Sequence, residues 1–180
     1  MSANGWVALL RGINVGGKNR VPMAELRTVF EEAGAAGVAT YIQSGNVVFV
    51  HPANDRAVLG EQLEAAVAKR FGVESAVVLR TFAEIGKVAR AKPFGPDNAN
   101  THVIFLAQKP PAAAVRSVTS LDMAPDEIKV VGSEAFLHYP NGVSGARIAG
   151  AVLGRSLGVG TARNWRTVTQ LAAMASAASL

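Results

Sequence analysis

The order of short apolar runs and helical patterns constrains the fold of this chain more than any other feature. In the first half, the β-rich runs are residues 6–10, 38–42, 46–50 and 76–79. Helical spacing of apolar residues follows the first run and again follows the third, and Gly34 and Gly72 mark the ends of these helices. A turn at 43–45 joins the second and third runs as a hairpin. The order β-α-β-β-α-β predicts a ferredoxin-like unit whose antiparallel sheet has the strand order 4-1-3-2.

The second half repeats most of this order. A capping box, Thr81 with Glu84, begins a connecting helix that should run to about Ala91, and residues 92–98 form the best boundary. The expected elements beyond it are strands at 103–107, 127–131 and 135–139, a helix after Pro110 and Pro111, and final helices at about 144–157 and 161–175. We therefore expect an α+β protein with a ferredoxin-like βαββαβ N-terminal half (1–91) and a related βαββαα C-terminal half (92–180).

Composition excludes several classes of protein. With 180 residues, 49% hydrophobic and 17% charged, the chain is globular and not disordered. No apolar run approaches the roughly 18 residues of a membrane span, and the N-terminal residues lack the pattern of a secretion signal. The absence of cysteine excludes disulfides, thiolate metal sites and cysteine nucleophiles. We expect a cytoplasmic protein with no membrane partner.

Positive charge is concentrated at the two ends of the chain. Residues 1–24 carry Arg11, Lys18 and Arg20 and no acid, which gives +3. Residues 135–180 carry four arginines and no acid, which gives +4, whereas residues 25–134 hold 11 basic and 13 acidic residues, which gives −2. If the two ends meet in space, they form a surface that attracts anions; otherwise the charge serves solubility.

The segment 11–20, with the sequence RGINVGGKNR, is the best candidate for a binding site. Its three glycines, two asparagines and three cations suit an unusual backbone path and an anionic ligand. In the expected sheet, this loop and the 43–45 turn lie at the same edge, two strand spacings or about 10 Å apart. The predicted ligand-binding residues at this edge are Arg11, Asn14, Gly16, Gly17, Lys18, Asn19, Gln43, Ser44 and Asn46. The equivalent loop of the second half, 108–111, contains no glycine, so the architecture alone does not require this one.

Other motifs carry less weight. Gly12 and Gly17-Lys18 match most of a phosphate-loop pattern, but Asn19 replaces the hydroxyl that would hold magnesium. The sheet lacks the aromatic pair of an RNA-recognition surface, since it offers only Trp6 and Phe49. The histidines are scattered, so we expect no metal site, and no cofactor is identified.

The segment 161–167 is the second informative stretch. Thr161 is expected to cap the last helix, Trp165 to face the core, and Arg163 and Arg166 to share a polar face. Arg163, Asn164 and Arg166 are therefore predicted to add charge and hydrogen bonds to the binding surface. The alternative is that Trp165 only anchors the helix and the arginines are solvated.

Three stretches resemble one bacterial family. VALLRGINVGGKN at 7–19, followed by VPMxxL at 21–26, is similar to the opening of a domain-of-unknown-function family (sixteen ninety-seven). TYIQSGNVVF at 40–49 and TxRNWxTV at 161–168 are similar to its other marks. The resemblance implies an α+β fold with a ferredoxin-like N-terminal part and no assigned activity, so it supplies no catalytic residues.

Three functional hypotheses follow. The favoured one is a cytoplasmic protein that binds a phosphorylated or other anionic ligand, a small molecule or a nucleic-acid backbone, at the 12–20 loop. The second is an enzyme acting on such a ligand, with Lys18 or Arg11 stabilising developing charge; it lacks an obvious base. The third is a protein–protein interaction module. Ligand, reaction and oligomeric state are not defined by the sequence.

Overall fold

A computed structural model describes residues 4–96, 98–145 and 156–179 of the chain. The chain divides into two compact units, Met1–Val88 with Gln170–Leu180, and Ala89–Thr169. Each unit contains one four-stranded sheet. Over the described residues, no helix has both the length and the apolar character needed to cross a membrane.

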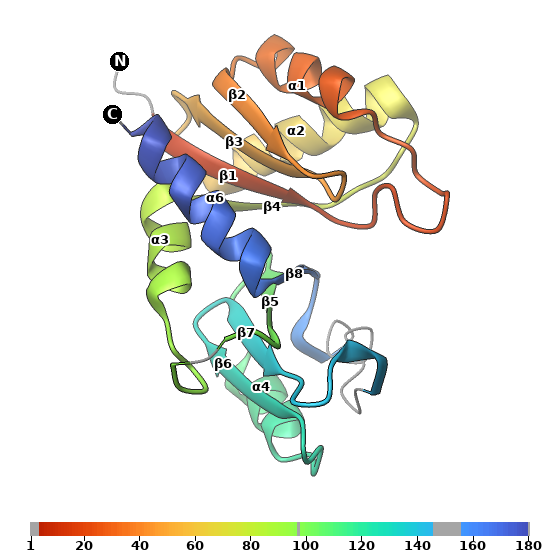
Figure 1. Cartoon of the computed structure of the whole chain (residues 1–180). Coiled ribbons are helices and arrows are strands. Elements are labelled where there is room, and N and C mark those ends of the chain that lie inside the picture. The colour runs from red at the N-terminus through yellow and green to blue at the C-terminus, as the bar shows by residue number, and fades with distance from the viewer. Residues whose placement is uncertain (1–3, 97, 146–155, 180) are drawn as a thin grey trace. The chain divides into compact units, whose positions relative to one another are not determined.

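The first unit has the expected split βαβ order. Its strands are β1 (Asn4–Leu10), β2 (Ala36–Tyr41), β3 (Asn46–His51) and β4 (Val77–Thr81). Its helices α1 (Met23–Glu32) and α2 (Arg56–Phe71) lie on one face of the sheet (Figure 1). All strand pairs are antiparallel and the order is β2-β3-β1-β4, which confirms the predicted order 4-1-3-2.

The core of the first unit lies between this sheet and the two helices. Side chains of β1 alternate, so Trp6, Ala8 and Leu10 point toward α1 and α2. The loop after β1 contributes Ile13 and Val21, which are 2% and 1% exposed, to the same cluster. The loop is therefore part of the core as well as of the surface. The helical and strand members include Leu26, Val29, Phe30, Val47, Phe49, Leu59, Leu63, Val67, Val77 and Leu79.

The second unit repeats the sheet. Its elements are β5 (Thr101–Leu106), α4 (Ala112–Thr119), β6 (Glu127–Val131), β7 (Glu134–His138), the 3-10 turn η1 (Val143–Gly145) and β8 (Gly160–Asn164), in the sheet order β6-β7-β5-β8. Most of the helix expected at 144–157 falls outside the described residues. The core on the α4 side includes Ile104, Leu106, Val118, Ala135, Leu137 and Tyr139. The α+β class and the relation between the halves are confirmed.

One detail of the predicted second half is wrong. The final helix was expected to begin at Thr161, but residues 160–164 form β8, which pairs with β5. Helix α6 (Trp165–Ala178) begins only after this strand. The backbone N–H of Thr167 donates to Asn164 Oδ1 at 2.9 Å, so Asn164, and not Thr161, caps the helix.

The backbone hydrogen bonds at the end of the central strand are the same in the two sheets. Leu10 N–H donates to the Gly45 carbonyl at 2.8 Å, and Leu106 N–H donates to the Ser133 carbonyl at 2.9 Å. One residue later, Arg11 N–H donates to Ala76 and Ala107 N–H donates to Val159. This register makes the fourth strands, β4 and β8, equivalent.

A buried arginine occupies the same position in each fourth strand. Arg80 lies opposite Val7, and Arg163 lies opposite Val103. Arg80 is 1% exposed and Arg163 is 7% exposed, and each donates one Nη1 hydrogen bond to the preceding carbonyl at 2.8 Å. Neighbouring Leu79 points into the helix-covered core, so Arg80 points to the opposite face of its sheet.

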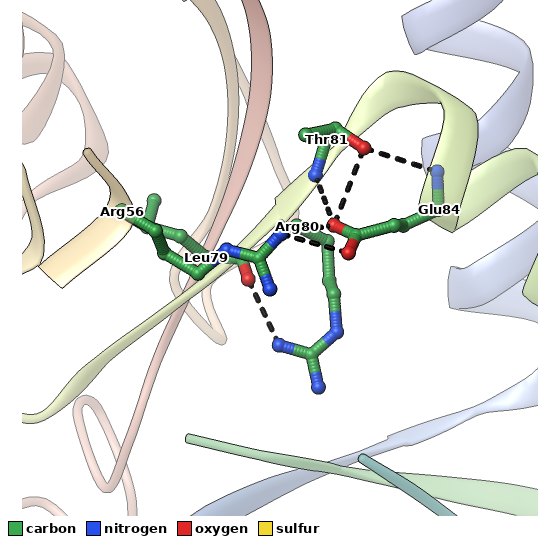
Figure 2. A network of polar contacts seen from close by, with 5 residues as sticks. All are labelled: Arg56, Leu79, Arg80, Thr81 and Glu84. Atoms are coloured by element: carbon green, nitrogen blue, oxygen red, sulfur yellow. Dashed lines mark hydrogen bonds and ion pairs between the residues drawn. The ribbon is translucent and has the colours of Figure 1, made fainter. Parts of the chain in front are cut away.

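A helix cap follows each of these arginines. Thr81 precedes α3 (Phe82–Arg90); its Oγ1 accepts from Glu84 N–H, and its own N–H donates to Glu84 Oε2, which confirms the predicted capping box (Figure 2). Arg56 Nη2 contacts both Glu84 carboxylate oxygens, at 2.6 and 2.7 Å. Burial alone would raise the pKa of Glu84, but the Arg56 and Thr81 hydrogen bonds and the Arg56 and Arg80 charges outweigh it and lower that pKa.

Candidate functional site

The loop after β1 folds back on itself as a small hairpin. Val15 and Lys18 form a bridge around Gly16-Gly17, and Lys18 N–H donates to the Val15 carbonyl at 3.0 Å. The next pair outward also closes, because Asn14 N–H donates to the Asn19 carbonyl at 3.0 Å. Gly16 and Gly17 have φ of 58° and 74°, the left-handed values that a tight two-residue turn requires. The two glycines thus set the turn.

Asn14 fastens this hairpin to the rest of the first unit. Its Oδ1 accepts from Val21 N–H at 2.8 Å, and its Nδ2 donates to the carbonyls of Val21 and Gln43 at 2.9 and 2.8 Å. Asn19 Nδ2 closes the base of the loop by donating to the Gly12 carbonyl at 2.8 Å. Both asparagines have positive φ, which asparagine tolerates better than most residues. Their amide groups therefore hold the backbone path of the loop.

The predicted meeting of this loop with the β2–β3 turn is observed. Asn14 contacts the Gln43 carbonyl, and the ideal Cβ position of Gly45 lies 2.6 Å from Ile13 Cδ1, so a side chain at Gly45 would displace Ile13. Asn46 is fully buried, and its Nδ2 donates to the Tyr41 carbonyl and to Ser44 Oγ. We call residues 11–20 together with residues 42–45 the loop edge.

The loop edge presents cations to solvent. Arg11, Lys18 and Arg20 are exposed, and within the described part of the chain no hydrogen bond or ion pair engages their side chains. The first turn of α1 follows directly, and Pro22 at its N-cap gives it no side-chain cap. These features produce a positive potential at the loop edge. The segments 11–22 and 41–46 contain no His, Asp or Glu, the commonest general bases.

The candidates of the second segment are placed differently from the expectation. Arg163 lies in β8 and is buried, where its Nη1 donates to Thr161 Oγ1 at 2.7 Å and to the Ala162 carbonyl. Burial lowers the pKa of Arg163 to about 10. The prediction that it shares an exposed helix face with Arg166 is wrong, because position 163 belongs to a strand. Asn164 caps α6, and Arg166 is exposed in its first turn.

Two apolar residues of the loop edge were not anticipated. Val15 is 66% exposed and Ile42 is 50% exposed. Ile42 also has φ of 50°, which is rare for a β-branched residue. The sequence offers one signal for Val15, since it directly precedes the Gly16-Gly17 turn at the tip of the loop. For Ile42 the sequence predicts an extended strand residue. In the structure β2 ends at Tyr41, and Ile42 belongs to the turn.

Comparison with known proteins places the chain in a family. The model of the family described as protein of unknown function (DUF1697) matches residues 3–136. The structure of conserved bacterial protein SP0830 from Streptococcus pneumoniae is similar with a TM-score of 0.79 and 24% identity, over 97% of this chain and 99% of that one. At this identity the likeness concerns the fold. A search of curated proteins gives no match. Because the family model covers most of the chain, the protein belongs to the DUF1697 family of proteins of unknown function.

Proposed function

We propose that this protein binds a phosphorylated or other anionic ligand at the loop edge. The observation that carries the proposal is a loop held in one conformation by Asn14 while it exposes Arg11, Lys18 and Arg20. A fixed backbone reduces the ordering cost of binding, and three exposed cations in a segment, 11–20, that contains no acid favour an anion. The first turn of α1 has no side-chain cap, so its N–H groups add a partial positive charge; Glu25 in that turn is paired with Arg70.

Arg163 is not part of this proposal. Its guanidinium is buried and donates to Thr161 and Ala162 within the second sheet. Asn14, Asn19 and Asn46 act through the backbone of the loop edge, and the side chains of Arg11, Lys18 and Arg20 make the ligand contacts. Binding without turnover is the simpler function, because the loop edge has no base of its own.

A thermal-shift series tests the proposal. Wild type, Lys18→Ala and Lys109→Ala are compared with phosphate, pyrophosphate, nucleotides and sugar phosphates. Lys109 is the matched control, since it is exposed on the equivalent loop of the second half. A ligand at 100 times its dissociation constant stabilises the protein by about 2.7 kcal/mol, which raises the melting temperature by several degrees.

We expect the shift to disappear in Lys18→Ala and to persist in Lys109→Ala. Lys18 is exposed, and its hairpin bond uses the backbone, so the alanine variant should retain the melting temperature of the ligand-free protein. Equal shifts in all three proteins would place the anion site elsewhere. A shift in none of them, with every anion tested, would contradict anion binding.

A further inference from the structure

We infer that the ligand of the loop edge is the backbone of a single-stranded nucleic acid. This inference rests on the proposed function and narrows it from anions in general to an extended strand that carries several phosphates beside unpaired bases. The argument depends on three properties of the loop edge. The first is that several N–H and amide donors of the loop are already engaged within it. The second is that its cations are separated along the chain, and the third is that Val15 and Ile42 are exposed.

Several internal donors of the loop are used within the hairpin and are not available to one phosphate. A phosphate loop directs successive backbone N–H groups at a single anion. Here the N–H groups of Asn14 and Lys18 donate across the hairpin to Asn19 and Val15. The side-chain amides of Asn14 and Asn19 are also engaged with backbone carbonyls. The exposed side chains of Arg11, Lys18 and Arg20 supply charge that reaches beyond the loop backbone.

The three cations occur at separate places in the hairpin. Arg11 is at its entrance, Lys18 follows the Gly16-Gly17 turn, and Arg20 precedes α1. One small phosphate contacts all three only if their flexible side chains converge on it. A chain of phosphates can contact each cation separately and release one counterion at each contact. The formal charge of +5 and a pI near 10 are also typical of nucleic-acid binding domains.

The apolar residues favour a single strand over a duplex. Val15 and Ile42 are 66% and 50% exposed, in the same loop edge as the cations. A β-branched residue at φ of 50°, as in Ile42, costs about 1–2 kcal/mol, and such strain is concentrated at binding sites. A duplex hides the faces of its bases, whereas an unpaired strand offers them next to its phosphates. An acidic polypeptide is the competing partner that the experiment must exclude.

Fluorescence anisotropy with a labelled single strand of about 12 nucleotides tests the inference, since this length is in the range of known single-strand sites. Affinity is measured between about 50 and 200 mM salt for wild type, Lys18→Ala and the control Lys109→Ala. Three phosphate contacts predict a slope of log K against log salt of about −2, and loss of one contact makes it shallower by about 0.7. We expect this change in Lys18→Ala and the wild-type slope in Lys109→Ala.

A second variant and two competitors complete the test. Val15→Ser should weaken binding of the single strand by up to about tenfold and leave the salt slope unchanged, because it removes apolar contact and no charge. The matching duplex and a glutamate-rich peptide should compete poorly. The inference is overturned if either competes as well as the strand, or if Lys18→Ala keeps the wild-type slope.

The failure of this inference can be told apart from the failure of the proposed function. If pyrophosphate protects wild type but not Lys18→Ala, and the single strand binds no more tightly than pyrophosphate, the loop edge is an anion site for a small ligand. In that case only the nucleic-acid inference falls. If neither the strand nor any of the small anions binds, both are wrong.

Discussion

The two sheets of this protein share a plan and differ most in the loop after the first strand of each. In the first unit, residues 11–22 separate β1 from α1; in the second, residues 107–111 separate β5 from α4. The backbone bonds made by Leu10 and Arg11 recur at Leu106 and Ala107. The longer loop is therefore an addition to the plan, since strand pairing and helix placement are achieved without it in the second unit.

The addition is built as a structural element. Ile13 and Val21 are buried in the core of the first unit, and Asn14 joins the hairpin to the β2–β3 turn. Loops of this length in compact domains are uncommon and are mostly functional or disordered. Burial and hydrogen bonding exclude disorder at its base, while Val15 and Lys18 remain exposed at its tip. The comparison shows that the first unit has a long, ordered loop that exposes Val15 and Lys18, and that the second unit has only a short connection at the equivalent place.

The largest effect is expected from the buried arginines that the two halves share. Arg80→Met and Arg163→Met remove a charged donor from the carbonyls of Leu79 and Ala162. Because the Leu79 carbonyl is buried and the Ala162 carbonyl partly buried, loss of these charge-assisted bonds should reduce the free energy of unfolding by about 3 kcal/mol in each variant. Urea titration followed by tryptophan fluorescence measures the loss.

Arg116→Met is the control for this pair. Arg116 is exposed on α4, so its replacement should change the free energy of unfolding by no more than about 0.5 kcal/mol. Similar losses at Arg80 and Arg163 would sharpen the comparison, since they would show that equivalent positions have equivalent energies. If either buried variant is as stable as wild type, Arg80 and Arg163 occupy equivalent positions but do not contribute equally to stability.

A smaller effect is expected at Asn14, where the two halves differ. Asn14→Gly retains the positive φ and removes the bonds to Val21 and Gln43. The expected loss is about 2 kcal/mol, from two partly buried hydrogen bonds to Val21 and one exposed bond to Gln43. Asn19→Gly, which removes one exposed bond, should lose less than half of this. Chemical denaturation compares the two, and equal losses would contradict the role given to Asn14.

Much of the fold follows from the sequence because its signals are local. The period of the apolar residues locates β1, α1, β3 and α2, and the capping box of Thr81 and Glu84 locates α3. Asp55 caps α2, its side chain accepting from the N–H groups of Ala57 and Val58. Strand β8 was missed because its residues TARN also read as a helix start, and only pairing with β5 decides between the two. That pairing is a tertiary contact.

The meeting of the two loops was predictable from the sequence, but the roles of their side chains were not. The topology of the first sheet brings the 11–20 loop to the 42–45 turn, and the contact of Asn14 with Gln43 confirms this. The roles of individual side chains depend on burial, which the sequence does not reveal. Arg163 and Asn46 are charged or polar residues of the kind that often bind ligands, yet both are buried. Ile42 is an apolar residue of the kind that usually lies in a core, yet it is half exposed.

The smallest effect concerns one pair of equivalent positions with different chemistry. Trp6 and His102 occupy the same register position in the central strands, opposite Thr81 and Asn164. In the described part of the chain, neither Trp6 Nε1 nor His102 Nδ1 has a hydrogen-bond partner, and both atoms are buried. Only the second half thus has a titratable group at this position.

Acid should therefore destabilise the protein through His102. Burial lowers the pKa of His102 below its ordinary value of 6.5, so between the two values the unfolded chain binds a proton that the folded chain does not. The contribution of neutral His102 to the free energy of unfolding is fully present above pH 6.5. It is lost as the pH falls toward the pKa that His102 has in the folded protein. Urea midpoints measured from neutral pH downward should decline in wild type and in Trp6→Phe, and should decline less in His102→Phe. The same acid dependence in all three proteins would assign it to other groups and remove this difference between the halves.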